Sequence, residues 1–179
     1  MDFTVDEIRK NLIESPYLSS MFSLYTHLSE SVSGKRILDF GCGYGWGCYE
    51  LSEKAANVMG YDRDALRIKT AQSWYSRNNL TFVSSWRFVQ EQIFDIVILF
   101  FVISYETNED DIAAIVNALH DLKGDGFRLC FAVKNIYKDK ADLFFSLLSE
   151  SWKKCRVIHC KEHPLFESEK IIEYSLELR

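Results

Sequence analysis

A run of alternating glycines at positions 41–47 follows an apolar segment and one acidic residue, Asp39. Glycines at alternate positions let the main chain turn sharply and let a ligand approach it closely. A helix that begins just after such a turn points its free N–H groups at that ligand. A carboxylate at Asp39 would repel a pyrophosphate and attract a cation. The segment therefore predicts a binding site for a cationic ligand.

The spacing of the glycines argues against a nicotinamide dinucleotide. Dinucleotide-binding loops carry the pattern G-x-G-x-x-G. Counted from Gly41, the sixth position is Trp46, and counted from Gly43 it is Cys48. An oxidoreductase that binds such a cofactor is therefore the least favoured functional class.

The segment DFGCGYG at residues 39–45 resembles the first motif of the class I S-adenosylmethionine-dependent methyltransferases, an apolar strand followed by acid-x-Gly-x-Gly-x-Gly. The resemblance implies that S-adenosylmethionine is the cofactor. It places the acid near the cofactor's amino group, often through water. The loop residues implied to pack against the methionyl part are Gly41, Cys42, Gly43 and Gly45.

The later motifs match less completely. In this family an acid at the end of the second strand accepts both ribose hydroxyls. Asp62 fills that position, although a turn or capping role is the alternative, and Arg63 would flank the adenine. Many members have an aspartate past the third strand, where this chain has Trp86. Main-chain N–H groups near Ser85 and Trp86 can still hold the adenine, and Phe100 at the end of the fourth strand completes the expected cofactor site.

The chain offers few obvious catalytic groups. Small-molecule members often carry histidine after the fourth strand, where this sequence has Ser104 and Tyr105. We expect Tyr105 to face the substrate, with packing as the alternative, and His27 to be the candidate base from the N-terminal helical region. The other polar candidates near strand ends are Glu106, Lys134, Asn135 and Tyr137, and the remaining histidines are His120, His159 and His163.

Other aromatic and sulfur residues have a structural interpretation. The N-terminal aromatic residues Tyr17, Phe22 and Tyr25 could cover the cofactor, but their helical spacing favours packing on a sheet. Cys42 and Cys48 are interpreted as small packing residues. The five cysteines include no C-x-x-C pair, so the sequence predicts neither a disulfide framework nor a metal site.

Apolar periodicity and turn residues predict the elements that position these groups. Alternating β-like and helical segments indicate a parallel sheet with helices on both faces. The expected strands are 36–40, 57–62, 81–84, 94–100 and 127–133, followed by an antiparallel hairpin of 155–160 with 170–178. The expected helices are two before residue 33, broken near Pro16, and then 45–56, 64–77 with Asp64 as N-cap, 108–122 and 139–151.

These elements add up to an α/β fold with a Rossmann-like, seven-stranded, mostly parallel sheet. Ligands on such sheets bind beyond the carboxyl ends of the strands. We expect one methyltransferase domain over residues 1–179, with a helical cap at 1–33 and the core at 34–179. A chain of this length fits one domain.

Composition limits the partners. The net charge of -5 argues against a large nucleic-acid footprint. The longest apolar run, Ile96–Ile103, is too short to span a membrane, and no signal peptide precedes it. Unpaired cysteines suit a reduced, cytoplasmic protein, which we expect to be a monomer or a homodimer.

The sequence thus predicts methyl transfer from S-adenosylmethionine to the oxygen, nitrogen or carbon of a small molecule. Transfer from a sulfonium needs alignment and exclusion of water more than a catalytic triad. Two alternatives remain open. One is a protein methyltransferase, and the other is a domain that binds cofactor or a partner without catalysis.

Overall fold

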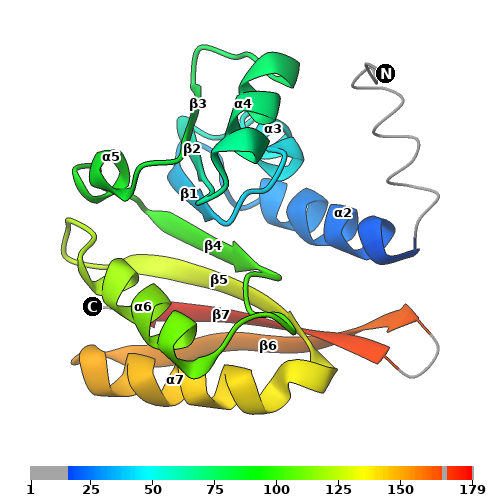
Figure 1. The fold of residues 1–179 in the computed structure, drawn as a ribbon, viewed down its shortest axis with the longest axis vertical. Helices are drawn as coiled ribbons and strands as arrows, with labels where there is room; N and C mark the ends of the chain where they lie inside the picture. The colour runs from blue at the N-terminus through cyan, green and yellow to red at the C-terminus, as the bar shows by residue number, and fades with distance from the viewer. Residues whose placement is uncertain (1–15, 167–168, 179) are drawn as a thin grey trace.

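The computed structural model describes residues 16–166 and 169–178. Its centre is a seven-stranded sheet with the order β3-β2-β1-β4-β5-β7-β6. Figure 1 shows this order from β3 at the top of the molecule to β6 at the bottom. The strand order reverses at β1 and β4, which is the topological switch point of the sheet.

Five strands run parallel and a terminal hairpin completes the sheet. β7 pairs antiparallel with both β5 and β6, so it is the one strand that runs against the others. This confirms the predicted fold class. The strands are β1 (Arg36–Phe40), β2 (Asn57–Tyr61), β3 (Leu80–Val83), β4 (Ile96–Phe100), β5 (Phe127–Lys134), β6 (Cys155–Phe166) and β7 (Glu169–Leu178).

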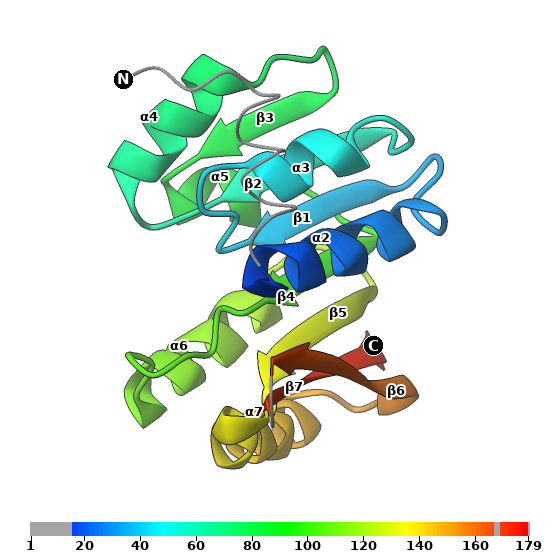
Figure 2. The same cartoon turned by 90° about the vertical axis from the view of Figure 1, so that its right-hand side faces the viewer.

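Helices cover both faces of the sheet, as Figures 1 and 2 show. One face packs against α2 (Pro16–Ser29), α3 (Trp46–Leu51) and α4 (Ala65–Trp74). The other face packs against α5 (Trp86–Gln90), α6 (Glu109–His120) and α7 (Lys138–Ser151). A short 3-10 helix, η1 (Asn135–Tyr137), joins β5 to α7.

Strand alternation decides which face each residue serves. Every residue of β4 is buried, as expected for a central parallel strand. Ile96 and Ile98 join the core under α2, whereas Val97 and Leu99 join the core under α6 and α7. The same alternation in β1 turns Asp39 toward α2 and α3, and Phe40 toward α5.

Side-chain caps fix the starts of two helices. Asp64 accepts hydrogen bonds from the main-chain N–H groups of Leu66 and Arg67, which confirms its predicted role as N-cap of α4. Asn108 and Asp111 form a reciprocal capping box at the start of α6. Both caps lie beside the carboxyl edge of the sheet, so they also fix the connections that leave it.

Several predicted boundaries were wrong. The helix predicted for 45–56 ends at Leu51, because the side chain of Asn79 donates to the carbonyl oxygens of Ser52 and Ala55 and holds the chain in a turn. The helix predicted for 64–77 ends at Trp74, where Tyr75 is extended. α5 and η1 were not predicted, and β6 continues past Cys160 to Phe166. The expected first helix lies outside the described residues.

Within the described ranges no helix is both long and apolar enough to cross a membrane. The same part of the chain contains no cluster of three potential metal ligands from histidine, cysteine, aspartate or glutamate.

Candidate active site

A cavity of about 580 Å³ opens at the carboxyl edge of the sheet. Its walls come from the ends of β1 and β2, from the start of α5, and from the loop and helix that follow β4. Open parallel sheets bind their ligands at this edge, beside the switch point. Gly41, Asp62, Arg63 and Trp86 of the predicted site line this cavity, which is therefore the candidate site.

The backbone conformation and close packing of the loop after β1 require glycine at several positions. Gly41, Gly43 and Gly45 all have positive φ, at 78°, 56° and 81°. A Cβ on Gly41 would lie 2.7 Å from Val102, and one on Gly45 would lie 2.5 Å from the ring of Phe82. A Cβ on Gly43 would meet nothing within 4 Å. The outer glycines thus permit close packing, whereas Gly43 leaves open space above the main chain.

Asp62 joins this loop to the end of β2. Its Oδ2 accepts the N–H of Gly43 at 2.9 Å and its Oδ1 accepts the N–H of Asp64 at 2.9 Å. The guanidinium of Arg67 lies 3.9 Å from Oδ2. The residue is only 6% exposed and lines the cavity. Each carboxylate oxygen has a second lone pair, so Asp62 can still accept two hydroxyl groups of a ligand.

Asp39 lies deeper, on the side of the sheet that faces α2 and α3. It is 1% exposed and accepts hydrogen bonds from the Tyr25 hydroxyl and the Cys48 thiol. Among the described residues it has no ion-pair partner. Burial raises the pKa of Asp39 to about 6, the two hydrogen bonds oppose this rise, and the charge of Asp62 adds to it. The side chain does not line the cavity.

Three aromatic side chains form the wall on the other side of the sheet. Trp86 lies edge-on to Phe40 and Tyr61, with ring centroids 5.4 and 5.2 Å apart. All three line the cavity, and Ser85 occupies the N-cap position of the helix that begins at Trp86, without a side-chain hydrogen bond to it. The Nε1 of Trp86 is buried and has no hydrogen-bond partner among the described residues. A ligand with a flat apolar ring would fit against this wall.

An ion pair spans the open side of the cavity. Arg63 follows β2 and lies 3.8 Å from Asp111 in the first turn of α6. The side chain of Arg63 is 82% exposed, so the pair is accessible to solvent. Glu106 also lines the cavity from the loop after β4. Exposed charges of both signs therefore flank the entrance.

The loop between β4 and α6 is held in one conformation. Phe101 is the single non-glycine residue of the described chain with positive φ, at 59°. The ammonium group of Lys140 in α7 donates to the carbonyl oxygens of Ser104, Tyr105 and Thr107, at 2.8, 3.0 and 2.6 Å. One cation from α7 thus binds three main-chain carbonyl groups within four residues of this loop.

Several predicted site residues lie away from the cavity lining. Tyr105 is 82% exposed and its ring does not line the cavity. His27 lies exposed in the last turn of α2. Phe100 is buried in the core, edge-on to Tyr25. The thiol of Cys42 faces the carbonyl of Gly43.

Three of the remaining candidate side chains pack against other aromatic residues or against the core. His120 packs edge-on against Trp152 at the end of α6. Phe22 stacks on Trp46, with ring centroids 4.8 Å apart, and Tyr137 packs against the core under α7. The side chains of Tyr17, His159 and His163 lie outside the described residues.

The sequence did not reveal three parts of the site. They are the contact of Tyr25 with Asp39, the hydrogen bond from Cys48, and the clamp made by Lys140. Strand alternation could have placed Phe40 and Tyr61 beside Trp86, because all three fall on one face. No pattern in the sequence identifies Lys140, which acts from a helix 33 residues beyond Thr107.

Comparison with known proteins identifies the class. A family described as "Methyltransferase domain" matches residues 37–126, which is half of the chain and includes the glycine loop, β2 and the loop after β4. The chain belongs to this methyltransferase family. The match confirms the resemblance to the class I S-adenosylmethionine-dependent methyltransferases.

Solved structures share the fold at low sequence identity. The N-methyltransferase NodS from Bradyrhizobium japonicum WM9, in complex with S-adenosyl-L-homocysteine, has a TM-score of 0.75 at 14% identity, over 94% of this chain and 90% of that one. Magnesium protoporphyrin IX methyltransferase (ChlM) from Synechocystis PCC 6803, with bound SAM, has a TM-score of 0.68 at 19% identity, over 98% and 86%. No curated protein matches the sequence.

Proposed function

We propose that this protein transfers a methyl group from S-adenosylmethionine to a small-molecule acceptor. The observation that carries the proposal is Asp62, a buried carboxylate that faces the cavity with both oxygens fixed by main-chain N–H groups. This geometry suits the two neighbouring hydroxyls of a ribose. When bound, S-adenosylmethionine supplies a methyl group already activated by a positive sulfur.

The residues of the cavity fit this cofactor. Phe40, Tyr61 and Trp86 offer an apolar aromatic wall for the adenine. The open space at Gly43 leaves room for the methionyl part. The charge of Asp39 below the glycine loop favours the cofactor's ammonium group.

The chain's own contribution to the reaction is positioning. Displacement at an activated carbon is accelerated mainly by alignment of the acceptor and by exclusion of water. The loop after β4, whose carbonyl groups accept from Lys140, carries Glu106 in the cavity wall and Tyr105 next to it in the chain, with an exposed ring outside the lining. We assign Tyr105 to the acceptor side, where its phenol can orient a nucleophile through a hydrogen bond. His27 is exposed on α2 and has no part in this proposal.

Two features support a small acceptor. From β1 to β6, each connection between consecutive strands holds one or two short helices, and none of these described connections contains an additional domain. The similar structures NodS and ChlM are described as an N-methyltransferase and a magnesium protoporphyrin IX methyltransferase, and the second name gives a small molecule, a porphyrin, as the acceptor. The acceptor atom therefore has to come from assays and not from the fold.

Isothermal titration with S-adenosylhomocysteine tests the proposal. Asp62→Asn replaces one acceptor oxygen by a donor and should weaken binding by about 1–3 kcal/mol, or roughly five- to 150-fold. Asp125→Asn makes the same change in the exposed turn before β5, at the opposite edge of the sheet, and should bind like the parent. Equal affinities for parent and Asp62→Asn would refute the assignment of Asp62, and a parent that ignores the compound would refute the function.

A further inference from the structure

Tyr25 of α2 contacts the acid of the glycine-loop motif directly. Its hydroxyl donates to the carboxylate of Asp39 and lies 3.1 Å from both oxygens. Both residues are buried, with 5% and 1% of their surface exposed. Burial and the neighbouring carboxylate hold the pKa of Tyr25 well above its usual value, so the phenol keeps its proton and remains a donor.

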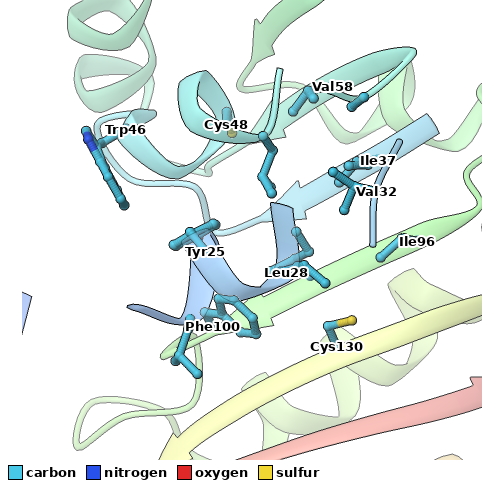
Figure 3. Close-up of a cluster of buried hydrophobic side chains, with 14 of the residues drawn as sticks. Tyr25, Leu28, Val32, Ile37, Trp46, Cys48, Val58, Ile96, Phe100 and Cys130 are labelled. Carbon is cyan, nitrogen blue, oxygen red and sulfur yellow. The ribbon is translucent and has the colours of Figure 1, made fainter. Parts of the chain in front are cut away.

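Packing contacts hold the ring of Tyr25 in an orientation that directs its hydroxyl toward the end of β1. It packs edge-on against Trp46 and Phe100, with ring centroids 5.8 and 5.1 Å apart. Figure 3 shows it between these two side chains. A Cβ on Gly47 would lie 2.3 Å from the ring, so α3 approaches Tyr25 as closely as a glycine allows. The hydroxyl therefore has a fixed position above Asp39.

We propose that Tyr25 is a positioning residue for the cofactor: its hydroxyl orients the Asp39 carboxylate beneath the glycine loop, so that α2 forms part of the cofactor site. The inference rests on the proposed function, since it assumes a ligand with an ammonium group near this loop. It extends that function to a residue of the N-terminal helical region, outside the glycine loop and outside the cavity lining.

The surroundings of Asp39 leave few groups that can favour its charged form. Tyr25 faces it from α2 and Cys48 faces it from α3, and both are neutral donors. Asp62 beyond the end of β2 is a like charge, and Cys42 lies in the loop above. No cation among the described residues pairs with Asp39. The ionised carboxylate therefore depends on two hydrogen bonds, one of which is that of Tyr25.

A pH dependence follows from this arrangement. The carboxylate attracts an ammonium group only when it is ionised, and its pKa is raised to about 6. Affinity for S-adenosylhomocysteine should therefore fall as the pH drops through this value. Removing the Tyr25 hydroxyl removes a bond that favours the ionised form, so the midpoint of this fall should move to higher pH.

The test is titration calorimetry with S-adenosylhomocysteine between about pH 5 and about pH 8, a range that brackets the pKa of the carboxyl. Tyr25→Phe keeps the ring and removes the hydroxyl. We expect a higher midpoint and an affinity several-fold below that of the parent near neutral pH. Tyr49→Phe makes the same change in α3, where the ring stacks on Tyr75 away from the cavity, and should reproduce the parent's profile.

The outcomes separate the inference from the function. A parent that binds S-adenosylhomocysteine, with a Tyr25→Phe profile identical to its own, overturns the role of Tyr25 and leaves the function intact. A parent that does not bind overturns both. Should Tyr25→Phe fail to fold, 3-fluorotyrosine at position 25 alone provides the test. Its more acidic phenol donates a stronger hydrogen bond, so the midpoint should move to lower pH, and an unmoved midpoint refutes the inference.

Discussion

Asp39 is a carboxylate buried without an ion-pair partner among the described residues, so its charged form costs folding free energy. Two neutral donors reduce this cost without removing it, and the pKa of the group stays raised, at about 6. The ionised Asp39 thus lowers the stability of the fold and favours binding of a cationic ligand. Buried groups with shifted pKa values gather at functional sites for this reason.

An Asp39→Asn substitution should separate the two effects. The folded pKa of about 6 exceeds the unfolded value of about 3.9, so this group stabilises the fold below the unfolded value and loses that contribution as the pH rises through 6. The variant lacks this loss and should be more stable than the parent at neutral pH, by roughly 1–3 kcal/mol. Urea unfolding at several pH values measures the difference.

The same variant should bind S-adenosylhomocysteine more weakly, and its affinity should not depend on pH in this range. A variant less stable than the parent at neutral pH would contradict the description of Asp39 as a buried charge. Comparison of the two proteins at each pH cancels other titrating groups. One of these is Asp95, whose pKa the Arg36 guanidinium lowers to about 2.

At this scale the sequence located the cofactor motifs but not their contacts. Asp39 and Asp62 were placed correctly at the ends of the first and second strands, because apolar runs and glycines mark strand ends in the sequence. The contact between Tyr25 and Asp39 could not be predicted. Helical spacing tells which side of α2 is buried, whereas the strand residue that it meets depends on how the helix docks.

At the scale of the helices and strands, too, local features were predicted and distant contacts were not. Helix starts were predicted where a local side chain caps them, as with Asp64. The end of α3 was not, because the carbonyl groups of Ser52 and Ala55, which follow the helix, accept from Asn79 in the connection before β3. α5 has five residues, too few for an apolar period to be recognised. Caps made by neighbouring residues could be predicted from the sequence, whereas hydrogen bonds from residues distant in the chain could not.

Lys140 of α7 holds the loop between β4 and α6 through three hydrogen bonds. Lys140→Met keeps the length of the side chain and removes three hydrogen bonds to the loop after β4. We expect faster amide hydrogen exchange over residues 103–108 and a loss of stability of about 1–3 kcal/mol, the scale of hydrogen bonds to a charged group. Affinity for S-adenosylhomocysteine should also fall, because Ser104 and Thr107 line the cavity.

Lys138→Met is the matched control for this experiment. Lys138 lies two residues away on the same helix and pairs with Asp142 of α7 itself, without touching the loop. This variant should leave the exchange of residues 103–108 unchanged. Similar exchange in the two variants would show that the loop is ordered by other contacts.

At the scale of the molecule, the described residues form two hydrophobic cores, one on each face of the sheet, and the candidate site touches both at one edge. Asp39 belongs to the side of α2 and α3, whereas Phe40, the next residue, belongs to the side of α5. A ligand held by both residues would link the two layers. The alternation of a single strand is enough to create this arrangement.

Ligand binding should therefore stabilise the entire fold. At a concentration one hundred times its dissociation constant, S-adenosylhomocysteine should add about 2.7 kcal/mol to the free energy of unfolding. For a chain of this size the expected rise in Tm is roughly 5–10 °C. Differential scanning calorimetry with and without the compound measures it, and an unchanged Tm would contradict binding at this site.

A distant core mutation provides the comparison. Leu148 of α7 is fully buried, far along the sheet from β1 and β2. Leu148→Ala should cost about 2–5 kcal/mol of stability through the cavity that it leaves. Its dissociation constant for S-adenosylhomocysteine, measured below its own Tm, should match that of the parent. A large change in affinity would mean that the two cores are energetically coupled.

The close approach of Tyr25 to Gly47 limits which sequences can share this arrangement. The phenol ring occupies the space that any side chain at position 47 would need. A homologue that acquires alanine or a larger residue at the position of Gly47 must therefore give up the tyrosine at the position of Tyr25, or tilt its first helix. We therefore expect homologues to change the residues at these two positions together, because the packing of the first helix depends on the contact between them.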